Sequence, residues 1–424
     1  MLRTFFFLSV LVLILSARFA FFYQNKIEYR VGDRVEFDYT FLKEPWIMFG
    51  KQIFTVSNIK IYAPDEPALH YGDKVRIIGE VEEEHFKNAK GNEIVQLAIR
   101  HPEVKLSEKV FGLSFISHMR DRINASFNRS LNRDDASLLM GIVFGIRQDM
   151  DKSFSLALRN TGVLHVVAAS GANVSMVGGF LLAVFALFLK RQWAIASACF
   201  AIIFYAVFSG LDPSIVRASV MAVFAYSAGV FGRQNTPLIT LSIAAFLMLF
   251  YNPELLSDAG FQLSYASTLG ILYIKPVFSR LPKSLTAITE DFTTTFAAQL
   301  ASLPILVITF SVFSPISVLV NLLVLWTVPL LMIGGGLASI FALLNPVLAQ
   351  PFLYLSLPLL WFFEKVVILG NQIAKPIELN SIPLSLVLGY YFVLVSLVLL
   401  IQKRFKNKDS RIMTGKQGFS SDKS

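Results

Sequence analysis

The sequence predicts a membrane protein of about ten transmembrane α-helices, with a small N-terminal β-barrel of the OB type outside the membrane. Hydrophobic residues make up 54% of the 424 residues and charged residues 16%, whereas a soluble domain carries about 25% charged residues. The apolar residues are gathered in runs of about 20, the length that crosses a bilayer. One segment, residues 25–105, is polar instead and alternates as strands do.

The N-terminal residues 1–24 are predicted to be a transmembrane anchor. Arg3 precedes an apolar run from Phe5 to Phe22. This run is longer than the apolar region of a usual signal peptide, and no small-x-small cleavage site follows it. Because positive charge stays on the cytoplasmic side, Arg3 predicts a cytoplasmic N-terminus.

Residues 25–105 are predicted to form the OB-like extracytoplasmic domain. Strand-like alternation occurs at 34–39, 53–62 and 74–81, and turn signals such as Pro64-Asp65 separate these runs. About five short strands fit a small OB barrel. The segment holds 12 Lys or Arg and 14 Asp or Glu, unlike the basic surface of a nucleic-acid binder. A structural or protein-contacting barrel is therefore favoured over a DNA-binding one.

Residues 106–160 are predicted to form amphipathic surface helices. Phe111, Phe115, Met119, Ile123 and Phe127 recur at four-residue spacing, which indicates one apolar helix face. Such a helix lies on the membrane or packs on the bundle. The apolar run 138–144 is too short to span.

Residues 161–402 are predicted to form the transmembrane domain, and residues 403–424 a basic cytoplasmic tail. The tail holds six Lys or Arg between 403 and 416, against Asp409 alone. With Arg3 inside, four of the five inner segments carry positive charge, which supports a multi-pass protein of the cytoplasmic (inner) membrane. The predicted spans after the anchor are 163–189, 192–209, 214–231, 236–251, 255–274, 292–312, 316–341, 350–370 and 384–402.

Two predicted helix starts place charges inside the membrane. Asp212-Pro213 and Asn252-Pro253 each provide an N-cap side chain followed by proline. Arg217 and Asp258 follow these caps, roughly 7–9 Å further along the helices. Charges in a span are costly and suggest function. Either the two pair or line a shared outer vestibule, or each snorkels separately to the interface.

Polar residues on two further helices are candidates for the same path. Gln262 and Tyr265 share a helix face with Asp258, and a polar face should meet protein or water. His165, Ala169 and Asn173 share a stripe of a continuous helix. The small residues 168–172 permit close helix approach, or Ser170-Gly171 kinks or unwinds the helix.

Several segments together resemble the ComEC competence family. They are HVVAASGANVSMV (165–177), LDPSIVRASVMAVF (211–224), SDAGFQLSYASTLGILY (257–273), SPISVLVNLLVLWTVPLLMIGGG (314–336) and, more loosely, residues 138–162. The resemblance implies transport of one strand of DNA across the cytoplasmic membrane during natural transformation. The positions that match the family's motifs are His165, Ser170, Gly171, Arg217, Asp258, Gly260, Phe261, Gln262 and Asn321.

Two departures from the family's pattern bear on this assignment. Asn173 stands where members often carry histidine, which puts chemistry at that position in doubt. Trp326 stands where a proline is common.

The resemblance also implies partners. Longer members end in a metallo-β-lactamase-like domain with an HxHxDH zinc motif, but the five histidines here form no HxH pair. We therefore expect no catalytic residue, metal or cofactor, and a separate nuclease. The chain has no Walker-type loop, and the membrane potential opposes anion import, so we expect a cytoplasmic helicase-like motor. A membrane-anchored DNA receptor and a homo-oligomer are further expectations.

Three alternatives remain open from the sequence. A transporter of a small solute or lipid would predict inverted repeats, which are not evident. An intramembrane enzyme would use Ser170 and His165, which lie roughly 140° apart around a helix unless that helix breaks. The third alternative is a degenerate family member that transports nothing.

Overall fold

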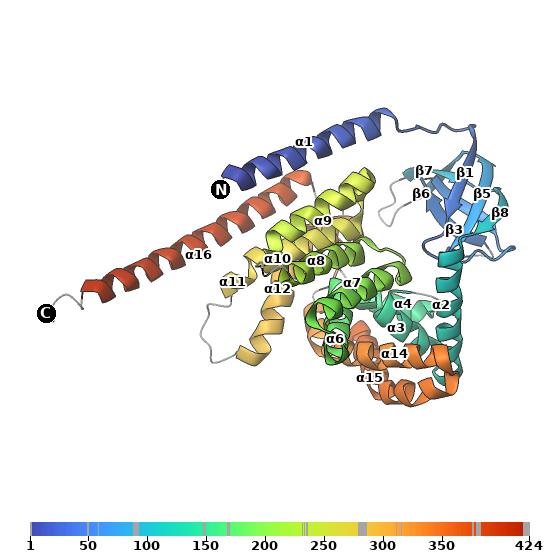
Figure 1. The fold of residues 1–424 in the computed structure, drawn as a ribbon. Coiled ribbons are helices and arrows are strands. Elements are labelled where there is room, and N and C mark those ends of the chain that lie inside the picture. The colour runs from blue at the N-terminus through green and yellow to red at the C-terminus, as the bar shows by residue number, and fades with distance from the viewer. Residues whose placement is uncertain are drawn as a thin grey trace.

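The computed structural model shows a mostly helical protein with a small β-domain near its N-terminus (Figure 1). It describes residues 2–48, 51–57, 59–87, 93–146, 150–167, 170–230, 232, 234, 236–278, 286–310, 312–314, 316–374, 377–378 and 383–418. The first helix begins, and the last ends, on the side away from the β-domain. The predicted topology, with the β-domain outside the membrane and both ends of the chain in the cytoplasm, stays a prediction.

The N-terminal helix α1 (Leu2–Gln24) packs against α9 (Pro237–Tyr251). Arg18 Nε donates to the Phe250 carbonyl at 3.1 Å, and Lys26 pairs with Glu254 at 2.8 Å. Glu254 belongs to the short 3-10 helix η1 (Pro253–Ser257), which follows α9. These polar contacts lie at the end of α1 next to the β-domain, so they fix that end of the helix to the bundle.

The β-domain consists of two sheets. A three-stranded antiparallel sheet has the order β1-β5-β8, and a second sheet has the order β2-β3-β4-β7-β6. Neither sheet closes on itself in the described residues, so the closed OB-like barrel that we predicted is not confirmed. The strand bounds are β1 Arg34–Thr40, β2 Trp46–Met48, β3 Lys51–Val56, β4 Ile59–Pro64, β5 Asp73–Glu80, β6 Glu82–Lys87, β7 Glu93–Ile99 and β8 Glu103–Lys109.

Side-chain alternation explains which strands were predicted correctly. In β1, Val35 and Phe37 are buried between exposed polar residues, as period-two alternation requires. The predicted single strand 53–62 is wrong, because Ser57 has φ 47° and turns the chain between β3 and β4. A left-handed residue of this kind suits a tight turn rather than a strand.

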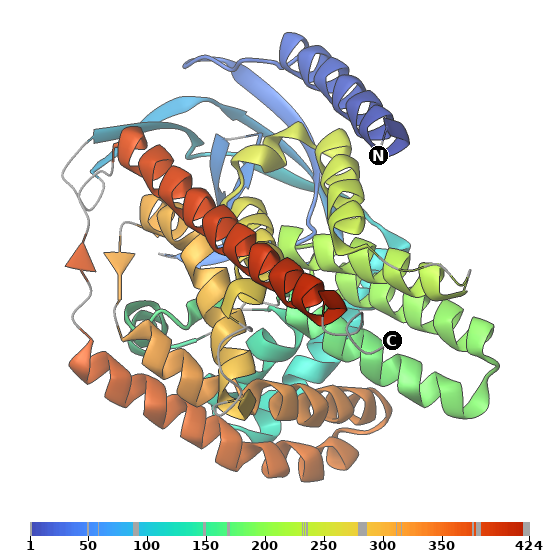
Figure 2. The same ribbon diagram turned by 90° about the vertical axis from the view of Figure 1, so that its left-hand side faces the viewer.

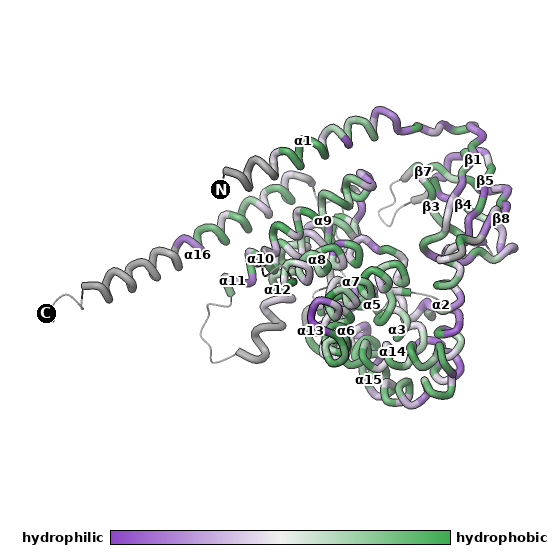
Figure 3. The backbone as a smooth tube through the Cα atoms, in the orientation of Figure 1, coloured by the Kyte–Doolittle hydropathy of each residue, from purple (hydrophilic) through white to green (hydrophobic). Residues whose placement is uncertain are grey.

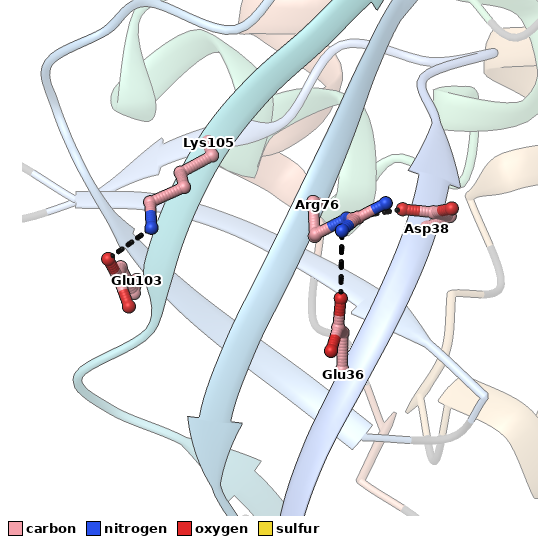
Figure 4. A network of polar contacts seen from close by, with 5 residues as sticks. All are labelled: Glu36, Asp38, Arg76, Glu103 and Lys105. Carbon is pink, nitrogen blue, oxygen red and sulfur yellow. Dashed lines mark hydrogen bonds and ion pairs between the residues drawn. The ribbon is translucent and has the colours of Figure 1, made fainter.

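The outer face of the β1-β5-β8 sheet carries balanced charges (Figure 4). Arg76 lies 3.3 Å from both Glu36 and Asp38, and Lys105 lies 2.8 Å from Glu103. All five side chains are about half exposed. Exposed pairs of this kind contribute little stability, so this face is a solvated surface with no excess of positive charge.

Four helices connect the β-domain to the membrane helices: α2 (Phe111–Ser130), α3 (Arg133–Phe144), α4 (Lys152–Asn160) and α5 (Leu164–Val167). The surface position predicted for residues 106–160 is wrong for α3, whose residues 135–144 are all buried. It packs on α14 (Thr327–Leu344), where a Cβ added to Gly335 would lie 2.7 Å from Val143 Cγ2. A helix that is apolar all round has no face to present to water.

A buried carboxyl at the start of α3 gives a pH prediction. Burial, and next the Glu364 carboxylate, raise the pKa of Asp135 from 3.8 to about 6. The folded state therefore holds this proton more tightly than the unfolded chain, and the free energy of unfolding falls as pH rises through this interval. Asp135→Asn should remove that fall, measured as the midpoint of thermal unfolding in detergent from pH 4 to 8. Asp121→Asn, at an exposed position on α2, is the control. An unchanged pH profile in Asp135→Asn would contradict the assignment.

Six helices in the described part of the chain are long and apolar enough to cross a membrane. They supply the stretches Gly171–Phe188 (α6), Arg191–Phe208 (α7), Pro213–Val230 (α8), Thr327–Leu344 (α14), Pro346–Ile373 (α15) and Ser385–Lys403, within α16 (Leu384–Gly418). Three apolar stretches are shorter: Ser9–Gln24, Pro237–Tyr251 and Thr293–Thr309. The protein is therefore a multi-helix membrane protein, and the predicted number of about ten spans is not confirmed. Figure 3 shows apolar residues along these helices and polar residues gathered in the β-domain.

Two of the predicted spans are broken. The span 163–189 divides into α5 and α6, and the span 316–341 divides into α13 (Ser317–Val324) and α14. The other helices are α10 (Ala259–Tyr273), α11 (Lys275–Phe278) and α12 (Thr286–Phe310), and the short strands β9 (Val312–Phe313) and β10 (Ile377–Glu378) pair. Helix α16 crosses α12 in Figure 2. The hydroxyls of Tyr390 and Tyr391 on α16 donate to the carbonyls of Leu300 and Ala301 on α12.

Candidate functional site

Arg217 lies at the point where the helices α6, α8 and α10 meet. It is in the second turn of α8 and only 9% exposed. Its Nε donates to Ser264 Oγ of α10 at 2.7 Å, and its guanidinium carbon lies 6.0 Å from the ring centre of Tyr265. Arg217 therefore joins α8 to α10 and points into protein rather than toward lipid.

Gly171, the first residue of α6, packs directly against this guanidinium. A Cβ added to Gly171 would lie 2.8 Å from Arg217 Nη2 and 3.3 Å from the Cβ of Ala218. A contact of 2.8 Å is too short, so the guanidinium can keep this position only beside a glycine and would shift away from a larger residue. The start of α6 and the guanidinium thus share one small volume.

Arg217 has no carboxylate partner among the residues that the structure describes. No ion pair within 4.0 Å includes it, and its polar neighbours are a hydroxyl and the thioether of Met221. Asp258 instead caps α10, where its Oδ1 accepts from the Phe261 N–H at 2.8 Å. The predicted Arg217–Asp258 pair is therefore not found. The predicted shared vestibule stays a prediction.

The break between α5 and α6 places the polar residues near 170 differently from a continuous helix. The predicted stripe of His165 and Asn173 does not form, because one helix ends at Val167 and the next begins at Gly171; Ala169 lies outside the described residues. The alternative, a break at Ser170-Gly171, is what the structure shows, with Ser170 at the N-cap position of α6.

Asn173 ties α6 to α3. It is 2% exposed, its Nδ2 donates to the Ile142 carbonyl at 2.7 Å, and its Oδ1 accepts from Ser170 Oγ at 3.0 Å. His165 is exposed, and its Nδ1 lies 3.0 Å from the Gly162 carbonyl oxygen. Ser170 and Asn173 thus hold the start of α6 in place beside Arg217.

The remaining predicted residues do not all lie beside Arg217. Gly260 and Gln262 lie at the start of α10, whereas Asn321 and Asp212 lie elsewhere. An added Cβ on Gly260 would lie 3.1 Å from Asp258 Oδ1, and Gln262 Nε2 donates to the Leu256 carbonyl at 2.8 Å. Asn321, on α13, is 1% exposed, and neither polar atom of its amide has a hydrogen-bond partner in the described part of the chain. Asp212 forms an ion pair with Lys43 of the β-domain.

A junction that sequence reasoning missed fixes the β-domain to the end of α7. Arg120 of α2 is 5% exposed, and its Nε donates to the Phe208 carbonyl at 2.8 Å, with a further short bond from Nη2. Its guanidinium lies 3.8 Å from the ring centre of Tyr71, whose hydroxyl donates to the Val207 carbonyl at 2.7 Å. A cation and a hydroxyl therefore satisfy carbonyls that a helix end leaves free.

The loop after α7 also contacts the β-domain, and it leads directly into α8, the helix that contains Arg217. Gly210 has φ 84°, and a Cβ there would lie 2.8 Å from the Leu42 carbonyl oxygen. Leu211 also has a positive φ, 55°. The Lys43–Asp212 pair follows, and α8 begins at Pro213. The sequence Gly210-Leu211-Asp212-Pro213 indicates this loop. Asp212-Pro213 alone predicted the start of α8, and Gly210 was not recognised as part of a turn.

The β-domain carries a groove of about 810 Å³ that is lined by more cations than carboxylates, although Lys43, Lys60 and Arg100 each already form an ion pair. Four cations line it, against the carboxylates of Glu44 and Glu84. A side-chain hydrogen bond with Tyr62, in which the Lys60 ammonium is the donor, is the first cause of the raised pKa of Lys60. Three aromatic side chains also line the groove. The cations are Lys43, Lys51, Lys60 and Arg100, and the aromatic residues are Tyr39, Phe54 and Tyr62.

These features define a multi-helix membrane protein with a buried arginine between its helices and an attached β-domain. The sequence model described as Competence protein matches residues 142–404. This is more than half of the chain, so the protein belongs to the competence protein family, and the predicted resemblance is confirmed.

One curated relative is ComE operon protein 3 of Bacillus subtilis (strain 168). It is 28% identical over 227 residues, which cover 53% of this chain and 29% of the relative's length. No solved structure shows significant similarity to the chain.

Proposed function

We propose that this protein passes single-stranded DNA across the cytoplasmic membrane during natural transformation. The observation that carries the proposal is Arg217, a buried cation on a membrane-spanning helix with no acidic partner in the described residues. An uncompensated charge in such a place is costly and is retained where it serves a function. A passing phosphate supplies the missing negative charge.

The helices around Arg217 suit an anionic substrate. The guanidinium lies against the first residue of α6 and bonds to α10. The N-terminal end of a helix carries partial positive charge, and its free N–H groups favour phosphate. Arg217 retains donors beyond the Ser264 and Met221 contacts. Together these groups offer a short polar contact to each phosphate in turn.

The groove on the β-domain supports the same proposal. Its cations match a phosphate backbone, and its aromatic rings offer platforms on which bases stack. The net charge of the whole domain argues against DNA binding, but the charges are unevenly distributed, with balanced pairs on the β1-β5-β8 face. Lys43 lines the groove and also pairs with Asp212 at the start of α8, so groove and membrane helices meet at one side chain.

The direction of transport requires an energy source. We place the β-domain outside and the basic end of α16 in the cytoplasm, as the predicted topology has it. A helicase-like motor at that face would pull the strand inward against the membrane potential. A membrane-anchored receptor would deliver DNA to the outer face.

The test is DNA uptake in a strain that lacks the gene. Labelled DNA should still bind the cell surface but should not be internalised, and the wild-type gene should restore import. Unchanged uptake in the deletion strain, in cells shown to be competent, would overturn the proposal. A growth defect that depends on a solute, without any uptake defect, would favour the solute transporter instead.

Gly171→Ala should reduce DNA import without preventing folding, because the added Cβ would displace the Arg217 guanidinium. Gly179→Ala is the matched control on the same helix, since its Cβ meets nothing within 4 Å. Alanine at an open helical position is mildly favourable, by about 1 kcal/mol. The measurement is internalised DNA per unit of protein in the membrane. Equal import in the two variants would show that the Gly171–Arg217 contact does not matter for transport.

A further inference from the structure

A second hollow lies between α6, α7 and α8. It is at the end of α6 and α8 that is opposite to Gly171 and Arg217. It has a volume of about 430 Å³. Apolar and small side chains line it, and Arg191 stands at the helix ends. The lining includes Leu182 of α6, Leu189 at its C-cap position, Ala194 and Ile195 of α7, and Ala225, Tyr226 and Gly229 of α8. We call it the α6–α8 groove.

The groove lies at the membrane surface and extends along the apolar part of the helices. Its residues come from the last turns of α6 and α8 and the first turns of α7. All three helices are apolar and 18 residues long, enough to span. Trp193 is 61% exposed beside it, and tryptophan prefers the interface between headgroups and hydrocarbon. The hollow therefore faces acyl chains, and its end faces headgroups.

The charge at the headgroup end is positive. Lys190 and Arg191 are adjacent and exposed, and no ion pair in the described part of the chain includes either. Arg191 Nη2 donates to the Gly229 carbonyl at 3.2 Å, which holds the guanidinium over the groove. No acidic residue lies in the first turn of α7, and no side chain caps it. The end of the groove is thus complementary to an anion.

We infer that the α6–α8 groove binds one acidic phospholipid. An acyl chain would fill the apolar hollow, and the phosphate would contact Lys190 and Arg191. Basic pockets between membrane helices hold acidic headgroups in this way. The site lies far along α6 and α8 from Gly171 and Arg217. The inference does not rest on DNA transport, only on α6 to α8 crossing the membrane.

The test is lipid binding to the purified full chain, measured by native mass spectrometry. The detergent-solubilised protein is titrated with dioleoyl phosphatidylglycerol or with dioleoyl phosphatidylcholine. The two lipids differ only in headgroup, so the wild-type protein should favour phosphatidylglycerol by about fivefold for each cation in contact. Equal binding of the two lipids would overturn the inference.

Two variants separate the headgroup contact from the chain contact. Arg191→Gln keeps a donor for the Gly229 carbonyl and should lose most of the preference for phosphatidylglycerol. Gly229→Leu places a side chain where an added Cβ meets nothing within 4 Å, so it should fold, fill the groove and weaken binding of both lipids. If Arg191→Gln does not fold, Lys190→Gln replaces it. Wild-type binding by Gly229→Leu would overturn the inference.

Two matched controls complete the experiment. Gly179→Leu adds the same side chain at an open position on α6, away from the α6–α8 groove lining. Lys403→Gln removes an exposed charge from α16. Both should bind the two lipids as the wild type does. A loss of preference in Lys403→Gln equal to that in Arg191→Gln would assign binding to general surface charge and overturn the site.

Discussion

Arg217→Ala is expected to reduce internalised DNA by about ten- to hundredfold, because a hydrogen bond to a charged group contributes about 1.5–3 kcal/mol. DNA bound at the cell surface should stay at the wild-type level. The β-domain groove, which we place outside the membrane, is not changed by this variant. The measurement is labelled DNA, counted separately as surface-bound and nuclease-protected.

Two further variants show whether charge or geometry matters at Arg217. Arg217→Lys keeps the charge but loses the planar fork that reaches both Ser264 and the α6 start. It should give intermediate import. Lys403→Ala removes an exposed cation at the far end of the bundle and should import normally. Normal import by Arg217→Ala, at a normal protein level, would show that the buried cation does not contact the substrate.

Arg120→Ala is expected to loosen the junction between the β-domain and α7. The variant loses two hydrogen bonds to the Phe208 carbonyl and the stacking on Tyr71. The expected cost is about 2 kcal/mol or more, and the amides of residues 207–212 should then exchange with solvent about thirtyfold faster. Hydrogen–deuterium exchange of the protein in lipid nanodiscs measures this directly.

The control for Arg120 lies two residues further along the same helix. Arg122 is exposed, so Arg122→Ala should leave exchange at 207–212 unchanged. Tyr71→Phe removes only the bond to the Val207 carbonyl and should have a smaller effect than Arg120→Ala. If Arg120→Ala exchanges at the wild-type rate, the β-domain is held by its other contacts, the Lys43–Asp212 pair among them.

Apolar periodicity predicted the elements whose burial depends on their own sequence. The apolar helices α7, α8, α15 and α16 and the alternating strands β1 and β5 were found where expected. The position of α3 was not predictable in this way. It is a short apolar helix with nothing in its own sequence to show that α14 would cover it. The hairpin β3–β4 was also missed, because Ser57 adopts a positive φ without a glycine to signal it.

Arg217 and Asp258 stood out in the sequence as charged residues at the starts of apolar helices, but the pairing predicted for them is not found. Depth along the helices placed Arg217 and Asp258 at one level, which suggested an ion pair. The free N–H groups at the start of α10 compete for the Asp258 carboxylate, which accepts a hydrogen bond from one of them. Arg120 escaped notice for a different reason. Its partner is a backbone carbonyl 88 residues away in the sequence. The pattern of side chains along a sequence does not show which distant backbone carbonyl a side chain will bind.

The burial of α3 has a consequence for how the protein is made. Helix α3 leaves the ribosome roughly 180 residues before α14, the helix that covers it. At about 5–20 residues per second, this delay lasts about ten to forty seconds. During that time α2, α5 and α6 are available to pack on α3, but the face that receives Gly335 of α14, which includes Leu139 and Val143, stays without its native partner. The native packing of α3 is therefore completed late in translation, only after α14 has been made.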